Sequence, residues 1–234
     1  MFFFDPLYLV FMLPGLALML WAQSKVRGSY AKYSKVQNDS RLTGAQVARR
    51  MLDANGLQNV AVEQTPGELS DHYDPRKRAL FLSQGVYGQA SIAAMGIAAH
   101  ETGHAIQHAQ AYGPLQVRTA IVPVVNIGSN LGIFVLLAGL FLSLTTLQWV
   151  GVVLFGLSTI FAFVTLPVEF DASRRAKDQL VQLGMVDGGV RGGPESEGVR
   201  RVLDSAAWTY VAGFAASLLT LLYYISMVSR SSND

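Results

Sequence analysis

The stretch that organises the chain is Ala98-Ala-His-Glu-Thr-Gly-His-Ala-Ile-Gln107, in which two histidines stand four residues apart. On a helix such residues share one face, so His100 and His104 can offer two imidazole nitrogens to one Zn²⁺. Glu101 then projects near the metal without binding it, where it can take a proton from a zinc-bound water and return it to a leaving amine. The alternative is a helix that merely carries two surface histidines. The small apolar run 91–99 disfavours it, because that run predicts a helix packed inside the protein.

Composition places the chain among membrane proteins. Of its 234 residues, 51% are hydrophobic and only 15% are charged, and the mean hydropathy is positive. The chain contains no cysteine, which excludes disulfides and thiolate zinc sites and leaves histidines and carboxylates as the strong metal ligands. No patterned aromatic and basic surface is present, so we expect no nucleic-acid partner.

Four stretches are predicted to cross the membrane, because each matches a hydrocarbon thickness of about 30 Å. Residues 2–22 are apolar except for Asp5 and precede a basic segment, which predicts a retained anchor (1–22) with its N-terminus outside rather than a cleaved signal peptide. Residues 119–168 carry no charge, and one helix of that length would measure about 75 Å. We therefore expect a two-span hairpin with its turn near 144–148. Residues 205–229 form the fourth predicted span.

The distribution of basic residues predicts the sidedness. Of 18 lysines and arginines, 17 lie in residues 23–118 and 169–204. By the positive-inside rule both segments are cytoplasmic. Because two spans return the chain to the side it left, Glu169 can meet the two histidines in one compartment.

Glu169 is the expected third ligand. A carboxylate suits a site with two histidines from one helix and leaves the fourth position for water. Asp171 competes for this role. Glu169 is preferred because Ser173 lies one turn further on the same face, where it could orient a ligand, and because Pro167 could begin the helix that presents both.

The segment before the zinc motif predicts a small α+β arrangement. Residues 43–56 predict a helix with Thr43 as N-cap, and residues 59–63 alternate like a strand. Residues 71–75 are expected to form a loop, and residues 78–83 a second strand. That second strand could present an open edge to an extended peptide by β-addition.

Several further residues are candidates for contacts near the site. His72 could be a third ligand or an oxyanion donor, or an ordinary surface residue. His108 is expected to be a packing or second-shell residue, because eight residues of helix rise about 12 Å, too far to share an ion with His100. Tyr73 is a candidate second-shell or substrate contact. Tyr210 could also approach the site, although an interfacial aromatic belt is the favoured interpretation. The glycine-rich residues 184–198 are a candidate lid.

The hairpin carries a polar pair. Asn126 and Asn130 share a helix face beside Gly128 and Gly132. Helix packing with interhelical hydrogen bonds is the favoured interpretation, and a polar lining for substrate access is the alternative.

With these residues in place, the chain resembles the YugP-type membrane zinc peptidases, a bacterial family of integral-membrane metalloproteases. The resemblance covers the N-terminal anchor and residues 71–75, 82–83, 98–107, 167–173 and 206–212. The chain is more distantly similar to the HtpX-type proteases, whose third ligand opens a Glu-x-x-Ala-Asp pattern. Glu169 and Ala172 match that pattern, whereas Ser173 stands in place of its aspartate. The resemblance implies proteolysis at a bacterial cytoplasmic (inner) membrane.

We therefore expect an α-helical integral membrane protein with about four transmembrane helices and a small α+β gluzincin-like cytoplasmic zinc domain. The expected divisions are an anchor (1–22), a zinc domain (23–118), a two-span hairpin (119–168), a cytoplasmic segment with the third ligand (169–204), a fourth span (205–229) and a tail (230–234).

The expected activity is zinc-dependent endopeptidase cleavage of membrane or misfolded proteins, a role in protein quality control. Zn²⁺ is the expected cofactor, held by His100, His104 and Glu169, with Glu101 as general base and acid. The expected partners are a polypeptide substrate, the lipid bilayer and either a second copy or a membrane protein. A zinc-containing scaffold without catalysis and a metal transporter are the alternatives. Glu101 disfavours the scaffold, and spans without ionisable residues disfavour the transporter.

Overall fold

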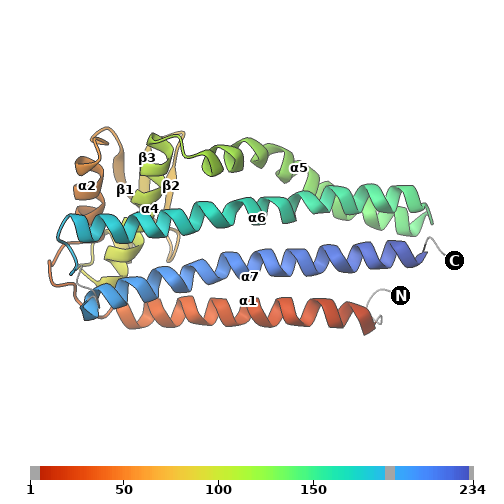
Figure 1. The fold of residues 1–234 in the computed structure, drawn as a ribbon, viewed down its shortest axis with the longest axis horizontal. Helices are drawn as coiled ribbons and strands as arrows, with labels where there is room; N and C mark the ends of the chain where they lie inside the picture. The colour runs from red at the N-terminus through yellow and green to blue at the C-terminus, as the bar shows by residue number, and fades with distance from the viewer. Residues whose placement is uncertain (1–5, 188–192, 232–234) are drawn as a thin grey trace. The chain divides into compact units, whose positions relative to one another are not determined.

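The computed structural model describes residues 6–187 and 193–231. Its elements are α1 (Pro6–Tyr33), α2 (Gly44–Ala54), β1 (Ala61–Thr65), β2 (His72–Asp74), β3 (Ala79–Ser83), α3 (Gln84–Tyr87), α4 (Ile92–Ala109), α5 (Gly113–Phe141), α6 (Thr145–Gln182) and α7 (Pro194–Ser231) (Figure 1). Contacts divide the chain into two compact units. The helical unit comprises Met1–Ala22, Gln116–Pro167 and Thr209–Asp234, and the mixed unit comprises Gln23–Leu115 and Val168–Trp208.

The helical unit is built from parts of α1, α5, α6 and α7. These four helices are long and apolar enough to cross a membrane, which confirms the predicted number of spans among the described residues. They pack in the order α1, α7, α6, α5 (Figure 1). Gly15 of α1 lies against Ala216 of α7, and Thr159 of α6 is 2.7 Å from the Ser217 hydroxyl of α7.

The hairpin between α5 and α6 depends on small residues. A Cβ at Gly132 would lie 2.7 Å from the backbone nitrogen of Phe155, so the two helices touch backbone to backbone. Gly128 faces the same helix, against Leu157. The predicted packing role of the two glycines is confirmed. The turn occupies residues 142–144, slightly earlier than predicted.

The mixed unit contains a three-stranded sheet in the order β1-β3-β2. β1 is parallel to β3, and β2 is antiparallel to it. Val62, Tyr73 and Leu80 align across one face of the sheet and pack in one apolar cluster with α4 residues such as Ala94 and Ala98. Because β3 is the central strand, the prediction that it offers an open edge to a peptide is wrong.

Three further sequence predictions need correction. Residues 71–75 were expected to form a loop, but His72–Asp74 form β2, because pairing with β3 extends a segment too short to show alternation. Pro167 does not begin a helix: α6 runs through it from Thr145 to Gln182. Part of the candidate lid is also helical, since α7 begins at Pro194. Residues 188–192 of that candidate lid lie outside the described residues.

Local chemistry explains the elements that were predicted well. Thr43 caps α2 through a capping box, in which its hydroxyl accepts from Gln46 N and the Gln46 side chain accepts from Thr43 N. The predicted helix at 43–56 is confirmed. The strand expected at 59–63 is also confirmed, two residues later, as β1.

Hydrogen bonds to Asp71 connect the start of β2 to the end of β3. Its carboxylate accepts from the Ser83 backbone nitrogen at 2.7 Å and from the Ser83 hydroxyl at 3.1 Å. Burial raises the pKa of the Asp71 carboxyl even though Ser83 donates to it. The sheet edge nearest α4 is therefore held by a partly buried polar contact.

Replacing Asp71 tests that contact. We expect Asp71→Ala to lower the free energy of unfolding by about 1–3 kcal/mol, because two donors of Ser83 lose their acceptor. Thermal unfolding of the detergent-solubilised protein measures the change. Glu63→Ala, at an exposed position of β1, is the control and should leave the melting temperature nearly unchanged. Equal melting temperatures for both variants would contradict the structural role of Asp71.

Candidate metal centre

α4 is the central helix of the mixed unit. Its first turn is capped by Ser91, whose hydroxyl accepts from Ala94 N at 3.1 Å. Its small residues are buried between two apolar clusters: Ala93 and Ala99 belong to one, and Ala98 and Ala105 to the other. The expectation of a packed helix is confirmed, and the histidines are fixed on a rigid, buried element.

Two turns of α4 and one of α6 bring three metal-ligating side chains together. His100 Nε2 lies 3.2 Å from Glu169 Oε2, and His104 Nε2 lies 3.5 Å from the same oxygen. One ligand atom from each of the three residues lies within 4.8 Å of the other two. Metal bonds of about 2.0 Å in tetrahedral geometry place ligand atoms about 3.3 Å apart. The two measured distances fit that value, and the donor set suits Zn²⁺.

The short distances between the histidines and Glu169 also shift the pKa values of the cluster. Burial disfavours the charged forms, but hydrogen bonds with Glu169 raise the pKa of His104. Burial would likewise raise the pKa of the Glu169 carboxyl, yet hydrogen bonds from His100 and His104 hold it well below its usual range. The Glu101 charge also raises the pKa of His104. Glu169 is thus a carboxylate at neutral pH, as a metal ligand must be.

Gly103 allows the two helices to approach this closely. A Cβ at this position would lie 2.6 Å from the carbonyl oxygen of Ala172 on α6, so the backbones of α4 and α6 are in contact. Gly103 stands one residue before His104, and Ala172 stands three residues after Glu169. The absent side chain therefore brings the carboxylate within reach of the imidazoles.

Gln107 orients the ring of His104. Its amide nitrogen donates to Val168 O at 2.8 Å and to Asp171 Oδ2 at 2.9 Å, so its oxygen faces His104 Nδ1, 3.0 Å away. An amide oxygen only accepts, so Nδ1 donates to it, and in the neutral ring Nε2, which faces Glu169, is the nitrogen left to bind a metal. Gln107 is fully buried, and it had no assigned role in the sequence prediction. The sequence feature that could have indicated this role is the position of Gln107, three residues after His104.

Ser173 and Asp171 contact different residues. Ser173 Oγ lies 3.1 Å from His100 Nδ1, where it can accept a hydrogen bond from that ring. Asp171, the competing third ligand, is not in the cluster. Its carboxylate accepts from Gln107, Arg174 and Arg175. Of the two candidate carboxylates, the structure brings only Glu169 to the histidines.

Two of the remaining candidate residues, His72 and Tyr73, belong to strand β2. His72 is exposed on the opposite sheet face from Tyr73 and stacks on Phe81 at 5.0 Å. The Tyr73 hydroxyl lies 2.8 Å from His108 Nδ1, at the exposed end of α4. Tyr210 belongs to the helical unit.

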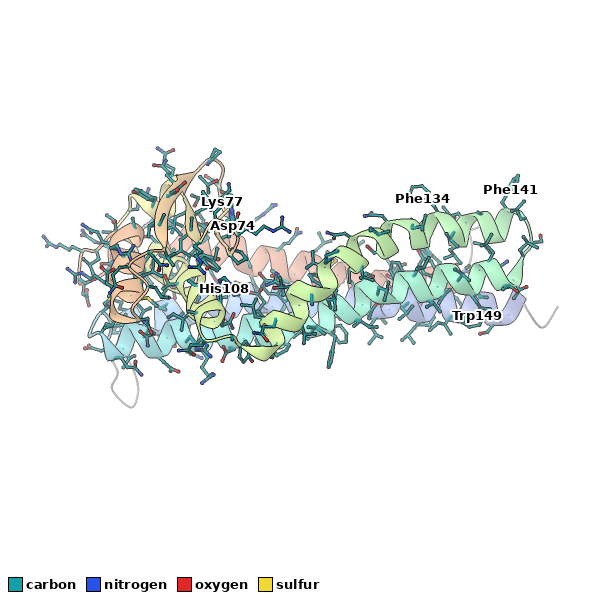
Figure 2. All side chains as sticks on the ribbon, turned by 90° about the horizontal axis from the view of Figure 1, so that it is seen from above. Asp74, Lys77, His108, Phe134, Phe141 and Trp149 are labelled. Carbon is teal, nitrogen blue, oxygen red and sulfur yellow. The ribbon has the colours of Figure 1, made fainter. Side chains whose placement is uncertain are left out.

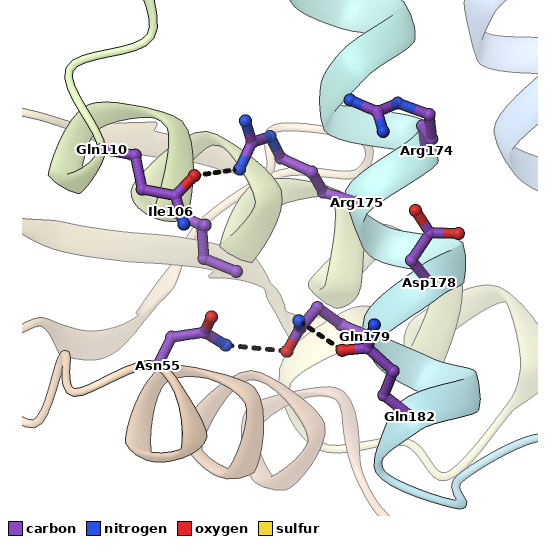
Figure 3. A pocket seen from close by; sticks show the side chains of 8 residues that line it. All are labelled: Asn55, Ile106, Gln110, Arg174, Arg175, Asp178, Gln179 and Gln182. Atoms are coloured by element: carbon purple, nitrogen blue, oxygen red, sulfur yellow. Dashed lines mark hydrogen bonds between the residues drawn. The ribbon is translucent and has the colours of Figure 1, made fainter.

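A separate pocket of about 210 Å³ lies elsewhere in the mixed unit (Figure 3). Its side chains largely bond to one another: Asn55 donates to Gln179, and Arg175 donates to Gln110. None of His100, His104 and Glu169 lines it. Hydrogen bonds join the pocket to the cluster through Asp171, which accepts from Arg175 at the pocket and from Gln107 beside His104.

Comparisons with known proteins give a consistent result. The model of a family described as "Putative neutral zinc metallopeptidase" matches residues 8–229. A curated relative from Bacillus subtilis (strain 168), named "Putative membrane protease YugP", is 44% identical over 228 residues, which cover 97% of this chain and 99% of the relative. No solved structure matches the chain.

Enlarging Gly103 tests the close approach of the helices. We expect Gly103→Ala to lower the free energy of unfolding by about 1–3 kcal/mol and to reduce the zinc content, because the new methyl group would push α4 away from α6. Metal analysis of the purified protein and its melting temperature measure both effects. Gly28→Ala is the control, since a Cβ there meets nothing within 4 Å. Retention of full zinc content by Gly103→Ala would contradict this account.

Replacing Gln107 tests the orientation of His104. Gln107→Met keeps the shape of the side chain but removes its acceptor, and we expect zinc affinity to fall roughly 10–100-fold. Competition with a chromogenic chelator measures the affinity. Gln64→Met, at an exposed position of β1, should bind zinc as the wild type does. Unchanged affinity in Gln107→Met would show that the ring is positioned by other contacts.

Proposed function

The chain belongs to the family described as "Putative neutral zinc metallopeptidase", and from that premise we propose that it is a membrane-bound zinc endopeptidase. The observation that carries the proposal is the convergence of His100, His104 and Glu169. A histidine pair and one carboxylate make three protein ligands, which leaves a fourth position for water or substrate. This open arrangement is characteristic of catalytic rather than structural zinc sites.

We assign the three clustered residues as the zinc ligands. Bound there, Zn²⁺ would lower the pKa of a water molecule and polarise the scissile carbonyl. The chain's own residues hold the ligands ready: Ser173 accepts from the His100 ring, and Gln107 accepts from the His104 ring. Both rings can then direct their Nε2 lone pairs to the metal.

Glu101 is the proposed general base and acid. It follows His100 on α4 and is partly exposed, so its carboxylate can exchange protons with groups in solvent. It takes a proton from the attacking water and returns it to the nitrogen of the leaving amine. A purely structural zinc site would have no need for this carboxylate.

The proposed substrates are membrane proteins and misfolded proteins reached from the cytoplasmic face. Both segments that form the mixed unit carry most of the basic residues, which supports a cytoplasmic location by the positive-inside rule. The curated relative is named a membrane protease. Cleavage at this face would suit a role in protein quality control at the bacterial inner membrane.

Zinc content and proteolysis of an unfolded soluble protein, measured side by side, test the assignment. We expect Glu101→Gln to keep zinc but to lose cleavage by roughly 10²–10⁴-fold, because the metal ligands remain and the general base is gone. We expect Glu169→Ala to lose both zinc and cleavage. A chelator should abolish the wild-type activity, and added Zn²⁺ should restore it.

Glu63→Gln, on the exposed face of β1, is the matched control and should behave as the wild type. A wild type that binds zinc but cleaves nothing would favour a zinc-containing membrane scaffold. Cleavage that persists in Glu101→Gln would remove this residue from the mechanism while leaving the metal assignment intact.

A further inference from the structure

The outward face of α5 contains two polar residues at membrane depth. Asn126 and Asn130 are both exposed, one turn apart on the same side of the helix. Asn130 lies twelve residues after Arg118 and eleven before Phe141, about 18 Å along a helix that crosses some 30 Å of hydrocarbon. Its amide is therefore placed near the middle of the span.

The described helices of this chain do not pack against this face. The opposite side of α5 is the one that packs on α6, through Gly128, Gly132 and Leu136. α5 stands at the end of the row α1, α7, α6, α5, so no other described helix of this chain lies beyond it (Figure 1). Large apolar residues of α5 are exposed as well, and Phe134 and Phe141 point away from the bundle (Figure 2).

Hydrogen bonding within α5 satisfies only some of the amide groups of Asn126 and Asn130. The Asn130 amide nitrogen donates to the backbone carbonyl of Asn126 at 2.7 Å. The interhelical bonds predicted for these residues from the sequence are not formed with any described part of the chain. Polar groups facing hydrocarbon are unfavourable, and asparagine side chains in spans commonly hydrogen-bond to another helix.

We propose that this face of α5, centred on Asn126 and Asn130, is the contact between two copies of this chain in the membrane. Two copies inserted in the same orientation are related by a two-fold axis along the membrane normal, so each asparagine meets its own counterpart at the same depth. A primary amide both donates and accepts, which makes it complementary to itself. Because the apolar residues around the pair suit lipid and protein equally, the amides select the partner.

The proposal depends on membrane insertion and not on proteolysis, so it can fail or succeed independently of the proposed function. The sequence contains no cysteine, and single-cysteine variants therefore give no background. Leu137 lies seven residues after Asn130 on the same face and is 47% exposed. Leu13 on α1, at the other end of the row of helices, is 54% exposed and serves as the matched control.

Oxidative cross-linking in native membranes is the test. We expect Leu137→Cys to form a disulfide-linked dimer between two differently tagged copies, and Leu13→Cys to remain monomeric. Adding Asn126→Leu and Asn130→Leu to Leu137→Cys should weaken dimerisation roughly tenfold, since an interhelical hydrogen bond in a membrane contributes about 1–2 kcal/mol in model peptides. Single substitutions to glutamine should retain part of the dimer.

Three outcomes would overturn the proposal. The first is equal cross-linking of both cysteine variants, which would indicate random collision. The second is cross-linking of Leu137→Cys to a different membrane protein, which would assign the face to another partner. The third is an undiminished dimer in the double leucine variant, which would show that the amides do not select the contact. Zinc content of each variant confirms that the mixed unit is folded.

Discussion

The contact on which the site depends is the meeting of two backbones, where Gly103 of α4 lies against the Ala172 carbonyl of α6. Residues separated by 69 positions become neighbours there, and the Glu169 carboxylate comes within 3.2 Å of His100. A carboxylate side chain is short, so a shift of α6 by one methyl group would separate it from the imidazoles. The convergence of the three side chains is therefore a consequence of helix packing. It also explains why a glycine stands inside a buried helix, where it would otherwise reduce stability.

Around this contact, each polar group in the buried site is held by another. Gln107 connects His104 to the backbone and to Asp171 on α6, and Asp171 in turn accepts from two arginines. Such a network satisfies groups that would be costly to bury alone. It also separates the roles of two carboxylates that stand two residues apart. Asp171 is occupied by cationic and amide donors, whereas Glu169 is left facing the imidazoles.

The sequence predicted the site better than the sheet around it. Spacing alone paired His100 with His104, and chain topology selected Glu169, because both signals depend on helix geometry and on the number of spans. The resemblance to YugP-type peptidases is confirmed by the family match and by the 44% identical relative. Strand β2 escaped prediction because three residues carry too little pattern, and its pairing with β3 is a tertiary contact. Gly103 and Gln107 were missed since their importance depends on what lies opposite them.

The two faces of α5 show which helix contacts in the helical unit can be predicted from sequence patterns. Glycines four residues apart predicted close packing, and they do pack on α6, because a missing side chain acts wherever a backbone can approach it. The neighbouring asparagines showed the same spacing and received the same interpretation, yet they point to the other side. A polar side chain in a membrane span indicates that a hydrogen-bond partner is needed, but it does not identify that partner. Because the described helices pack on one face of α5 and leave the amides on the other, we infer a partner from another molecule. A second copy is the candidate whose amides are certain to lie at the matching depth.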